Sequence, residues 1–591
     1  MQIIKNKDRS RLIKAAKGLI PCDVSIDNVQ LVNVLTGEIY PAGVDILDGV
    51  VVRVRESGRP CTPAAAQAVD GQGKYLLPGF IDVHMHVEST MMVPENFGKA
   101  AVVWGTTTAV TDPHEIANVM GVAGVKYMLD SAKRSPLRIY TLAPSCVPAV
   151  PHLEGAGAAF FAKEVSELLA EDGMIGVAEV MDYIGVINDA PRMHDIIQAG
   201  LDVDGFIQGH APCVSGDDLC AYLCGGPVSD HEVRAAGELV EKLRLGMHAN
   251  IKSSSLSDTV QEFIKGVKNV PIRDNVSICT DDVHAADLLS TGHISHVVNE
   301  CVKGGISSMD AIRFATYNAA RELRLEDGGC VAPGYVADLQ IVSDLTFANR
   351  PDMVFVAGKM VSKDGVLLTE KAVKAIEPGV NTVNIPQITS PDVFGISSDK
   401  AEEKLLVFSA ARSSMQPGQK LVYRSFPVEN GKVVIPDIKE NQFISVVNRH
   451  GSGDMTTVIC SDFCLMHGCV ASTISHDSHN MTIAYTDPKD AYVAAKALEK
   501  MGGGMVYVEN GEVVTALPLP VAGLMSPLPV EEIAPVIAAM DEAVMKASDY
   551  RSPMLLAIAI LALPVRPGII ITDRGIIRGE TLEFIPQRLD G

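Results

Sequence analysis

The chain has 591 residues, with 47% apolar residues and a formal net charge of −22. This length excludes a single small domain, and the apolar content excludes disorder for the bulk of the chain. Because 72 acidic residues outnumber 50 basic ones, the sequence disfavours general binding to nucleic acid, whose phosphates an acidic protein repels.

The N-terminus and the longest apolar run both argue against export or a membrane span. The chain starts MQIIKNKDRSRLIKAAKG, which lacks the apolar core of a secretory signal. The run at 554–565, MLLAIAILALPV, is shorter than the roughly 20 residues that cross a bilayer, and it predicts a buried strand or core segment. Twelve scattered cysteines without a CxxC pair are typical of reduced thiols. We therefore expect a cytoplasmic protein with no membrane contact.

Short β-branched runs occur on both sides of a long middle region. One group lies within residues 20–75 and the other within 331–361, and turn residues separate the runs in each group. Such runs predict short antiparallel strands. We expect one small β-sandwich-like domain built from both flanks, with boundaries at 1–75 and 326–378.

The middle and the end of the chain have different patterns. Residues 76–325 alternate apolar strand-like runs with helical stretches, which favours βαβ units and a parallel sheet. About eight such units in this length predict a (β/α)₈ barrel. Residues 379–591 mix strand and helix patterns without a fixed repeat, and we expect an α+β domain there. The predicted fold class is therefore α/β.

The strongest local signal is GFIDVHMHVE, in which an apolar run ends at His84 and His86. Residues two apart on a strand share one face, so the two imidazoles can bind one metal ion. In a barrel, the carboxyl ends of the strands form the active-site end. The alternative is a pair of surface histidines after a strand.

Later strand ends supply similar groups. The candidates are Glu179, His210, His231, Asp281 and Asp282. Together with the first two histidines they exceed what one tetrahedral ion needs, and they suit a two-metal site with a bridging carboxylate. Imidazoles and carboxylates suit zinc, manganese or iron. For any single candidate, the alternative is a helix cap or a solvated loop charge.

Two further polar clusters have less certain chemistry. Asp112, His114 and Glu115 in TDPHE follow the next predicted strand and could orient substrate or support the metal ligands, or form a turn. The second cluster is HDSHN, with His476, Asp477, His479 and Asn480. It could hold a third metal, contact substrate or line the barrel mouth, and the alternative is a hydrogen-bonded turn.

Ten motifs are distinctive: GFIDVHMHVEST, TDPHEIANVM, GVAEVMDY, GHAP, SDHE, CTDD, APGYVADL, ASTISHDSHN, LPLPVAGLMS and ALPVRPGIIITDRG. Through these motifs the sequence resembles the bacterial adenine deaminase family of the amidohydrolase superfamily. The motifs span most of the chain, including its C-terminal part. The segment MHANIKSSS departs from the Arg-Glu-Gly-Ser-like run that is usual there.

The resemblance implies a binuclear centre, usually manganese or iron with zinc possible, at the carboxyl end of the barrel. The implied ligands are His84, His86, Glu179, His210, His231 and Asp281, with Glu179 as the bridge. Many cyclic-amide hydrolases of this superfamily use a carboxylated lysine as the bridge. The sequence contains no lysine from Glu164 through Glu241, which disfavours that branch.

The implied reaction is hydrolytic deamination of adenine to hypoxanthine and ammonia. Glu179, His231, Asp281 and Asp282 are the candidates for catalysis and proton transfer, and the sequence does not separate the two aspartates. The alternatives are hydrolysis of another amino-purine, heterocycle or cyclic amide, and a non-enzymatic protein that kept the barrel. We expect a small-molecule purine as substrate, and a homo-oligomer is possible.

Overall fold

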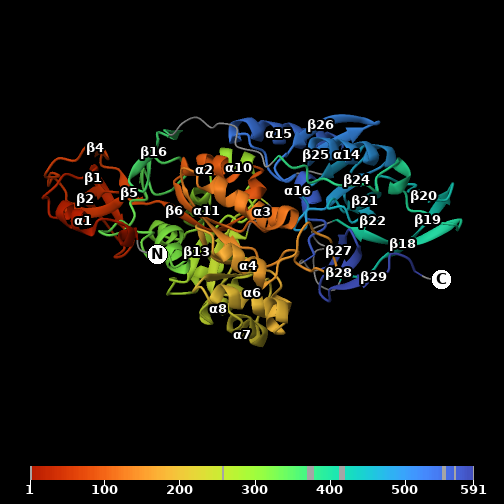
Figure 1. The fold of residues 1–591 in the computed structure, drawn as a ribbon, viewed down its shortest axis with the longest axis horizontal. Helices are drawn as coiled ribbons and strands as arrows, with labels where there is room; N and C mark the ends of the chain where they lie inside the picture. The colour runs from red at the N-terminus through yellow and green to blue at the C-terminus, as the bar shows by residue number, and fades with distance from the viewer. Residues whose placement is uncertain are drawn as a thin grey trace.

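The computed structural model describes residues 3–255, 259–368, 379–410, 419–548, 554–564 and 568–589. The chain begins with the 3₁₀ turn Ile3–Asn6 and helix α1 (Arg9–Ala16). Figure 1 shows three parts in a row: a β-rich part at the N-terminal end, a barrel in the middle and a second β-rich part at the C-terminal end. Among the described residues, no helix is long and apolar enough to cross a membrane.

The first β-rich part is one sheet assembled from both flanks of the barrel. The N-terminal flank gives β1 (Val24–Asn33), β2 (Glu38–Leu47), β3 (Val50–Glu56), β4 (Gln67–Asp70) and β5 (Tyr75–Pro78). The later flank gives β14 (Leu339–Val342), β15 (Met353–Val356), β16 (Lys359–Lys363) and β17 (Val366–Leu367). Antiparallel pairing of β14 with β5, Leu339 opposite Pro78, joins the two flanks. The alternating valines and isoleucines of these strands enclose one core, as the two-flank prediction requires.

Eight parallel strands form the barrel. They are β6 (Phe80–Met85), β7 (Thr106–Thr111), β8 (Arg138–Ala143), β9 (Met174–Val180), β10 (Phe206–Gly209), β11 (Ser229–Asp230), β12 (His248–Lys252) and β13 (Val276–Cys279). The first five pair in chain order, as do the last three. Backbone hydrogen bonds from Val228 N to Ile207 O and from Asp281 N to His84 O, both 3.1 Å, connect the two groups. The predicted (β/α)₈ barrel is confirmed.

Helices follow the barrel strands and cover their outer faces. They are α2 (Pro94–Val102), α3 (His114–Ala132), α4 (Ala162–Leu169), α5 (Tyr183–Ile187), α6 (Pro191–Leu201), α7 (Gly216–Cys224), α8 (Ala236–Arg244), α9 (Val260–Lys268), α10 (Ala285–Ser290), α11 (Ile294–Lys303), α12 (Ser308–Arg313) and α13 (Ala319–Glu322). Helix α9 shows why they pack there. Its buried residues Val260, Phe263, Ile264 and Val267 recur at helical spacing, so one apolar stripe faces the barrel.

The C-terminal part is a nine-stranded sheet with two long helices and a small three-stranded sheet. The large sheet contains β18 (Glu402–Ser409), β19 (Tyr423–Glu429), β20 (Lys432–Val433), β21 (Asn441–Val447), β22 (Met455–Ser461), β23 (Cys469–Ser472), β24 (Met481–Tyr485), β25 (Gly504–Glu509) and β26 (Glu512–Pro518). Its helices are α14 (Pro488–Met501), α15 (Val530–Lys546) and the short α16 (Met554–Ala559). The small sheet contains β27 (Ile569–Thr572), β28 (Gly575–Arg578) and β29 (Glu583–Ile585). The apolar run at 554–565 thus begins as a helix rather than a strand, and it contributes to the core.

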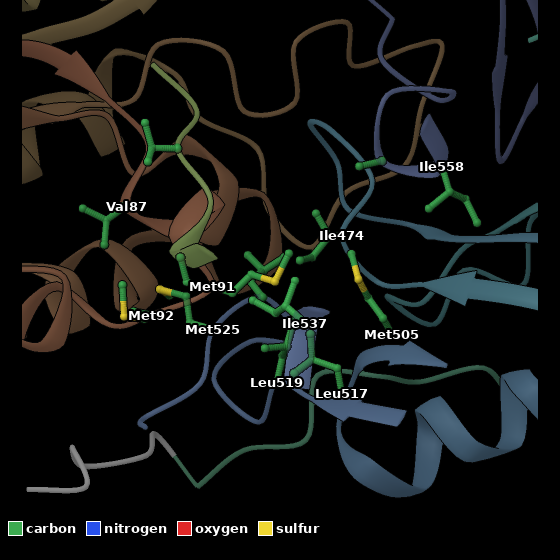
Figure 2. Close-up of a cluster of buried hydrophobic side chains, with 14 of the residues drawn as sticks. Val87, Met91, Met92, Ile474, Met505, Leu517, Leu519, Met525, Ile537 and Ile558 are labelled. Atoms are coloured by element: carbon green, nitrogen blue, oxygen red, sulfur yellow. The ribbon is translucent and has the colours of Figure 1, made fainter. Parts of the chain in front are cut away.

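A continuous apolar core joins the barrel to the C-terminal part. Val87, Met91 and Met92, which directly follow the paired histidines, pack in the same cluster as Leu519 and Met525. Figure 2 shows these side chains meeting between the two parts. Backbone atoms add to the contact, because Ser526 N donates to Met91 O at 2.7 Å. The C-terminal part is therefore fixed against the loop that leaves the first metal-ligand strand.

Candidate metal centre

The structure brings all six predicted metal ligands together at the carboxyl ends of the barrel strands. His84 lies on β6 and His86 directly follows it, while Glu179 lies near the end of β9. His210, His231 and Asp281 follow β10, β11 and β13. All six are buried except His210, which is partly exposed. This convergence follows from parallel strands that share one carboxyl end.

The two oxygens of Glu179 face different pairs of histidines. Its Oε1 lies 3.2 Å from His86 Nε2 and 3.9 Å from His84 Nε2. Its Oε2 lies 2.7 Å from His210 Nδ1 and 3.3 Å from His231 Nε2. A carboxylate that bridges two ions presents one oxygen to each, and Glu179 is placed to do this.

Hydrogen bonds fix the tautomers of the first two histidines. His84 Nδ1 lies 2.8 Å from Gln208 Oε1, and the amide orientation of Gln208 is fixed because its Nε2 donates to Val83 O at 2.9 Å. His86 Nδ1 lies 3.0 Å from the carbonyl oxygen of Asp112. Both acceptors lack a proton, so each Nδ1 carries a hydrogen, and Nε2 is the atom at which a metal ion would bind in place of any proton there. Both Nε2 atoms point at the carboxylates, as metal-binding histidines require.

Asp281 and Asp282 occupy different surroundings. Asp281 Oδ1 lies 3.2 Å from both His84 Nε2 and His86 Nε2, and its Oδ2 accepts a 2.8 Å bond from Lys252 Nζ. Asp282 instead accepts a hydrogen bond from Ser89 Oγ at 2.5 Å. The structure therefore places Asp281 among the ligands and Asp282 beside them.

The charges of the centre favour a bound cation. Burial raises the pKa of Glu179, but the hydrogen bond from His210 and its charge outweigh burial and hold that pKa well below its usual value. Burial lowers the pKa of His86, yet Asp281 and Glu179 raise it well above its usual value. Anionic carboxylates buried among imidazoles attract positive charge, which divalent ions supply with the nitrogen and oxygen ligands present here. The residues therefore fit a metal centre.

The cluster after β7 lies against the metal-ligand residues. The Asp112 carboxylate accepts a hydrogen bond from His114, with 2.9 Å between Oδ2 and Nδ1. The carbonyl oxygen of Asp112 accepts the hydrogen bond from His86 Nδ1. His114 Nδ1 is also 3.7 Å from Glu179 Oε1. Glu115 turns away from these groups, with Oε1 3.1 Å from His476 Nδ1 of the C-terminal part. Together these residues link the centre to the C-terminal part.

The HDSHN cluster divides into two halves. His476 and Asp477 line the cavity over the metal-ligand residues. Asn480 Nδ2 donates to Gly155 O at 2.8 Å, which places Asn480 in the contact between the barrel and the C-terminal part. His479 is fully buried, with Nε2 3.7 Å from Glu115 Oε2.

A third metal at Glu115, His476 and His479 fits less well than the main centre. The ligand atoms of these three residues lie within 4.8 Å of one another. However, Ser475 N donates to His479 Nδ1 at 3.2 Å, so the proton of the neutral ring sits on Nε2. That nitrogen then has no lone pair for a metal. The arrangement instead directs an N–H group toward the Glu115 carboxylate.

Polar and apolar side chains both line the cavity. Five of the six predicted ligands, all except His84, line it together with Asp282, Glu232 and Arg234. Met181, Pro212, Ile560 and Leu563 supply the apolar lining, the last two from the C-terminal part. Such a cavity suits a flat heterocycle with polar groups at one edge.

Sequence reasoning did not identify Gln208 or Lys252 as site residues. Lys252 is the last residue of β12, and its side chain is buried between Asp281 and Glu232. The other candidates were identified because a polar or charged residue ends an apolar strand run. Lys252 shows the same pattern in the segment MHANIKSSS. Gln208 has no such signal, because its role depends on contacts with β6, a strand that does not pair with its own strand β10.

Comparison with known proteins agrees with this geometry. Residues 75–361 match the model of the amidohydrolase family, and residues 419–583 match that of the adenine deaminase C-terminal domain. A protein of Oleidesulfovibrio alaskensis named adenine deaminase is 36% identical, with 99% of each chain covered. One of the same name from Serratia proteamaculans is 35% identical, covering 98% of this chain and 97% of that protein. A solved adenosine deaminase from Xanthomonas campestris with bound zinc gives a TM-score of 0.44 at 14% identity, covering 59% of this chain and 94% of that one.

The barrel and the candidate metal-binding clusters at its strand ends are those of an amidohydrolase, a metal-dependent class of enzyme. Similarity over the full chain, including the C-terminal part, is more specific. The chain belongs to the adenine deaminase family.

Proposed function

We propose that this chain is a hydrolase that converts adenine and water to hypoxanthine and ammonia. The observation that carries the proposal is the division of the two Glu179 oxygens between two pairs of histidines. The substrate is supported by the full-length relatives named adenine deaminase and by the match of the C-terminal part. These relatives favour adenine over another amino-purine, heterocycle or cyclic amide.

Two divalent ions fit the donor set, with manganese or iron preferred to zinc on the family resemblance. His84, His86, Asp281 and one oxygen of Glu179 would hold one ion, and His210, His231 and the other oxygen of Glu179 would hold the second. Divalent ions in such sites lower the pKa of bound water from 15.7 to about 7, which supplies a nucleophile at neutral pH.

The reaction requires proton transfers that the cavity residues can perform. The water oxygen bonds to C6 of adenine and the C6–N6 bond breaks. One water proton is transferred to N1 of the ring and the other to the amino group, which leaves as ammonia. Asp282 lines the cavity next to the ligand Asp281 and is held by Ser89. We therefore assign proton transfer to Asp282 and metal binding to Asp281.

The C-terminal part completes the substrate site in this proposal. His476 and Asp477 would contact the purine, because both line the cavity together with the barrel residues. Glu115 holds His476 in place through their 3.1 Å contact. Asp112 and His114 would support the ligands, since they contact His86 and Glu179.

An adenine deamination assay on manganese-loaded protein tests the proposal. The ultraviolet spectrum follows adenine loss, and ammonia release is measured in parallel. We expect equal amounts of hypoxanthine and ammonia from the wild type, and loss of at least about two orders of magnitude in kcat with Glu179→Gln. Glu167→Gln, on the exposed side of α4, is the matched control. The proposal fails if the loaded wild type leaves adenine unchanged.

A further inference from the structure

The end of α16 and the segment that follows it have a core side and a cavity side. Ile558, Ala559, Leu561 and Ala562 are buried in the core that joins the C-terminal part to the barrel. Figure 2 shows Ile558 within that core. Ile560 and Leu563 are only partly buried, and both line the cavity that contains the metal-ligand residues.

Hydrogen bonding holds this segment against the active-site cluster. His476 N donates to Ala559 O at 2.9 Å, so the chain that leads into Ile560 is attached to a residue of the cavity. The burial of Leu561 and Ala562 fixes it from the other side. The two apolar side chains are therefore part of the wall of the cavity.

The chemistry of adenine determines which end of the ring points away from the metal-ligand residues. Deamination requires C6 to approach the metal-ligand residues. In a purine, N9 lies at the far end of the fused rings from C6, so the N9 edge points away from those residues. An N9 ribose would bring three hydroxyl groups toward apolar side chains, which offer them no hydrogen-bond partner. Arg234, which also lines the cavity, has its Nη2 atom 3.5 Å from Oε2 of Glu232, so one side of its guanidinium faces that carboxylate.

We propose that Ile560 and Leu563 determine specificity for the free purine base, by excluding purines that carry a sugar on N9. This inference rests on the proposed function and assigns the discrimination to the C-terminal part, not to the barrel. Shortening either side chain opens space at the N9 end and leaves the metal-ligand residues in place.

The test compares adenine, 9-methyladenine and adenosine as substrates of the full-length manganese-loaded protein. The variants are Ile560→Ala, Leu563→Ala and the double change, with Val513→Ala on the exposed face of β26 as the control. We expect the kcat/KM ratio of adenosine to adenine to rise at least about tenfold in the double variant, with 9-methyladenine gaining in the single variants. Metal content is measured in each variant to show that the centre is intact.

The outcomes separate this inference from the proposed function. A purely structural role for the segment would lower turnover of all three substrates together and leave their ratio unchanged. An unchanged ratio in variants that still deaminate adenine overturns the specificity assignment alone. Absence of adenine turnover in the wild type, with two metals bound, overturns the proposed function and this inference with it.

Discussion

Replacing Gln208 with leucine tests how the centre prepares His84 to bind a metal. Gln208 Oε1 accepts the Nδ1 proton of His84 at 2.8 Å, and this bond keeps the Nε2 lone pair directed at the carboxylates. Leucine has similar size but no acceptor, so the buried N–H loses its partner and the ring loses its orientation. Loss of such supporting bonds typically lowers metal affinity 10- to 100-fold, or about 1.4–2.7 kcal/mol.

The assay is competition for Mn²⁺ between the apoprotein and a chelator of known affinity. Gln340→Leu is the matched control, because Gln340 is also fully buried and its Nε2 donates to Pro78 O at 3.2 Å, within the N-terminal sheet. We expect Gln208→Leu to weaken the binding of one Mn²⁺ ion and Gln340→Leu to leave Mn²⁺ affinity unchanged. Equal affinity of the wild type and Gln208→Leu would refute the tautomer argument.

Three further changes have defined outcomes. Lys252→Met leaves buried carboxylates, including that of Asp281, without their cation. We expect a loss of about 3–5 kcal/mol in the free energy of unfolding in urea, which Lys252→Arg partly restores. An unfolding midpoint of Lys252→Met equal to that of the wild type would contradict this. Burial lowers the pKa of His450 to about 3, so a proton binds the unfolded chain more tightly than the folded one. The contribution of the neutral His450 to stability is therefore lost as the pH falls from about 6.5 toward 3. His450→Gln should therefore lose less stability between pH 7 and pH 5 than the wild type. The control is His194→Gln, at an exposed histidine, which should match the wild type. Identical dependence of stability on pH in all three proteins would exclude a contribution of His450. Leu519 lies in the core shown in Figure 2, and Leu519→Ala should lower the free energy of unfolding by about 2–5 kcal/mol, measured by heat or urea. A change below about 1 kcal/mol would show that the core between the barrel and the C-terminal part contributes little to stability.

Local sequence patterns predicted the barrel half of the site well. His84 and His86 share a strand face because strand side chains alternate, and parallel strands bring Glu179 and Asp281 to the same end. These are consequences of regular backbone geometry, so a single sequence contains them. The two-flank sheet follows similarly from β-branched runs on both sides of the barrel.

The contribution of the C-terminal part could not be derived from periodicity. His476 lies 361 residues beyond Glu115 in the sequence, and their 3.1 Å contact depends on how two separately folded parts pack. The separate surroundings of Asp281 and Asp282 likewise depend on Lys252 and Ser89, which come from other strand ends. The helical start of 554–565 was also hidden, because a short apolar run fits a helix and a strand equally well.

The central claim is a binuclear centre bridged by Glu179, and a metal titration tests it most directly. Apoprotein is titrated with Mn²⁺, while bound metal and adenine turnover are measured at each step. The structure predicts that turnover reaches its maximum at two equivalents per chain, and that Glu179→Gln fails to retain both. Maximal turnover at one equivalent, or full turnover without metal, would contradict the account.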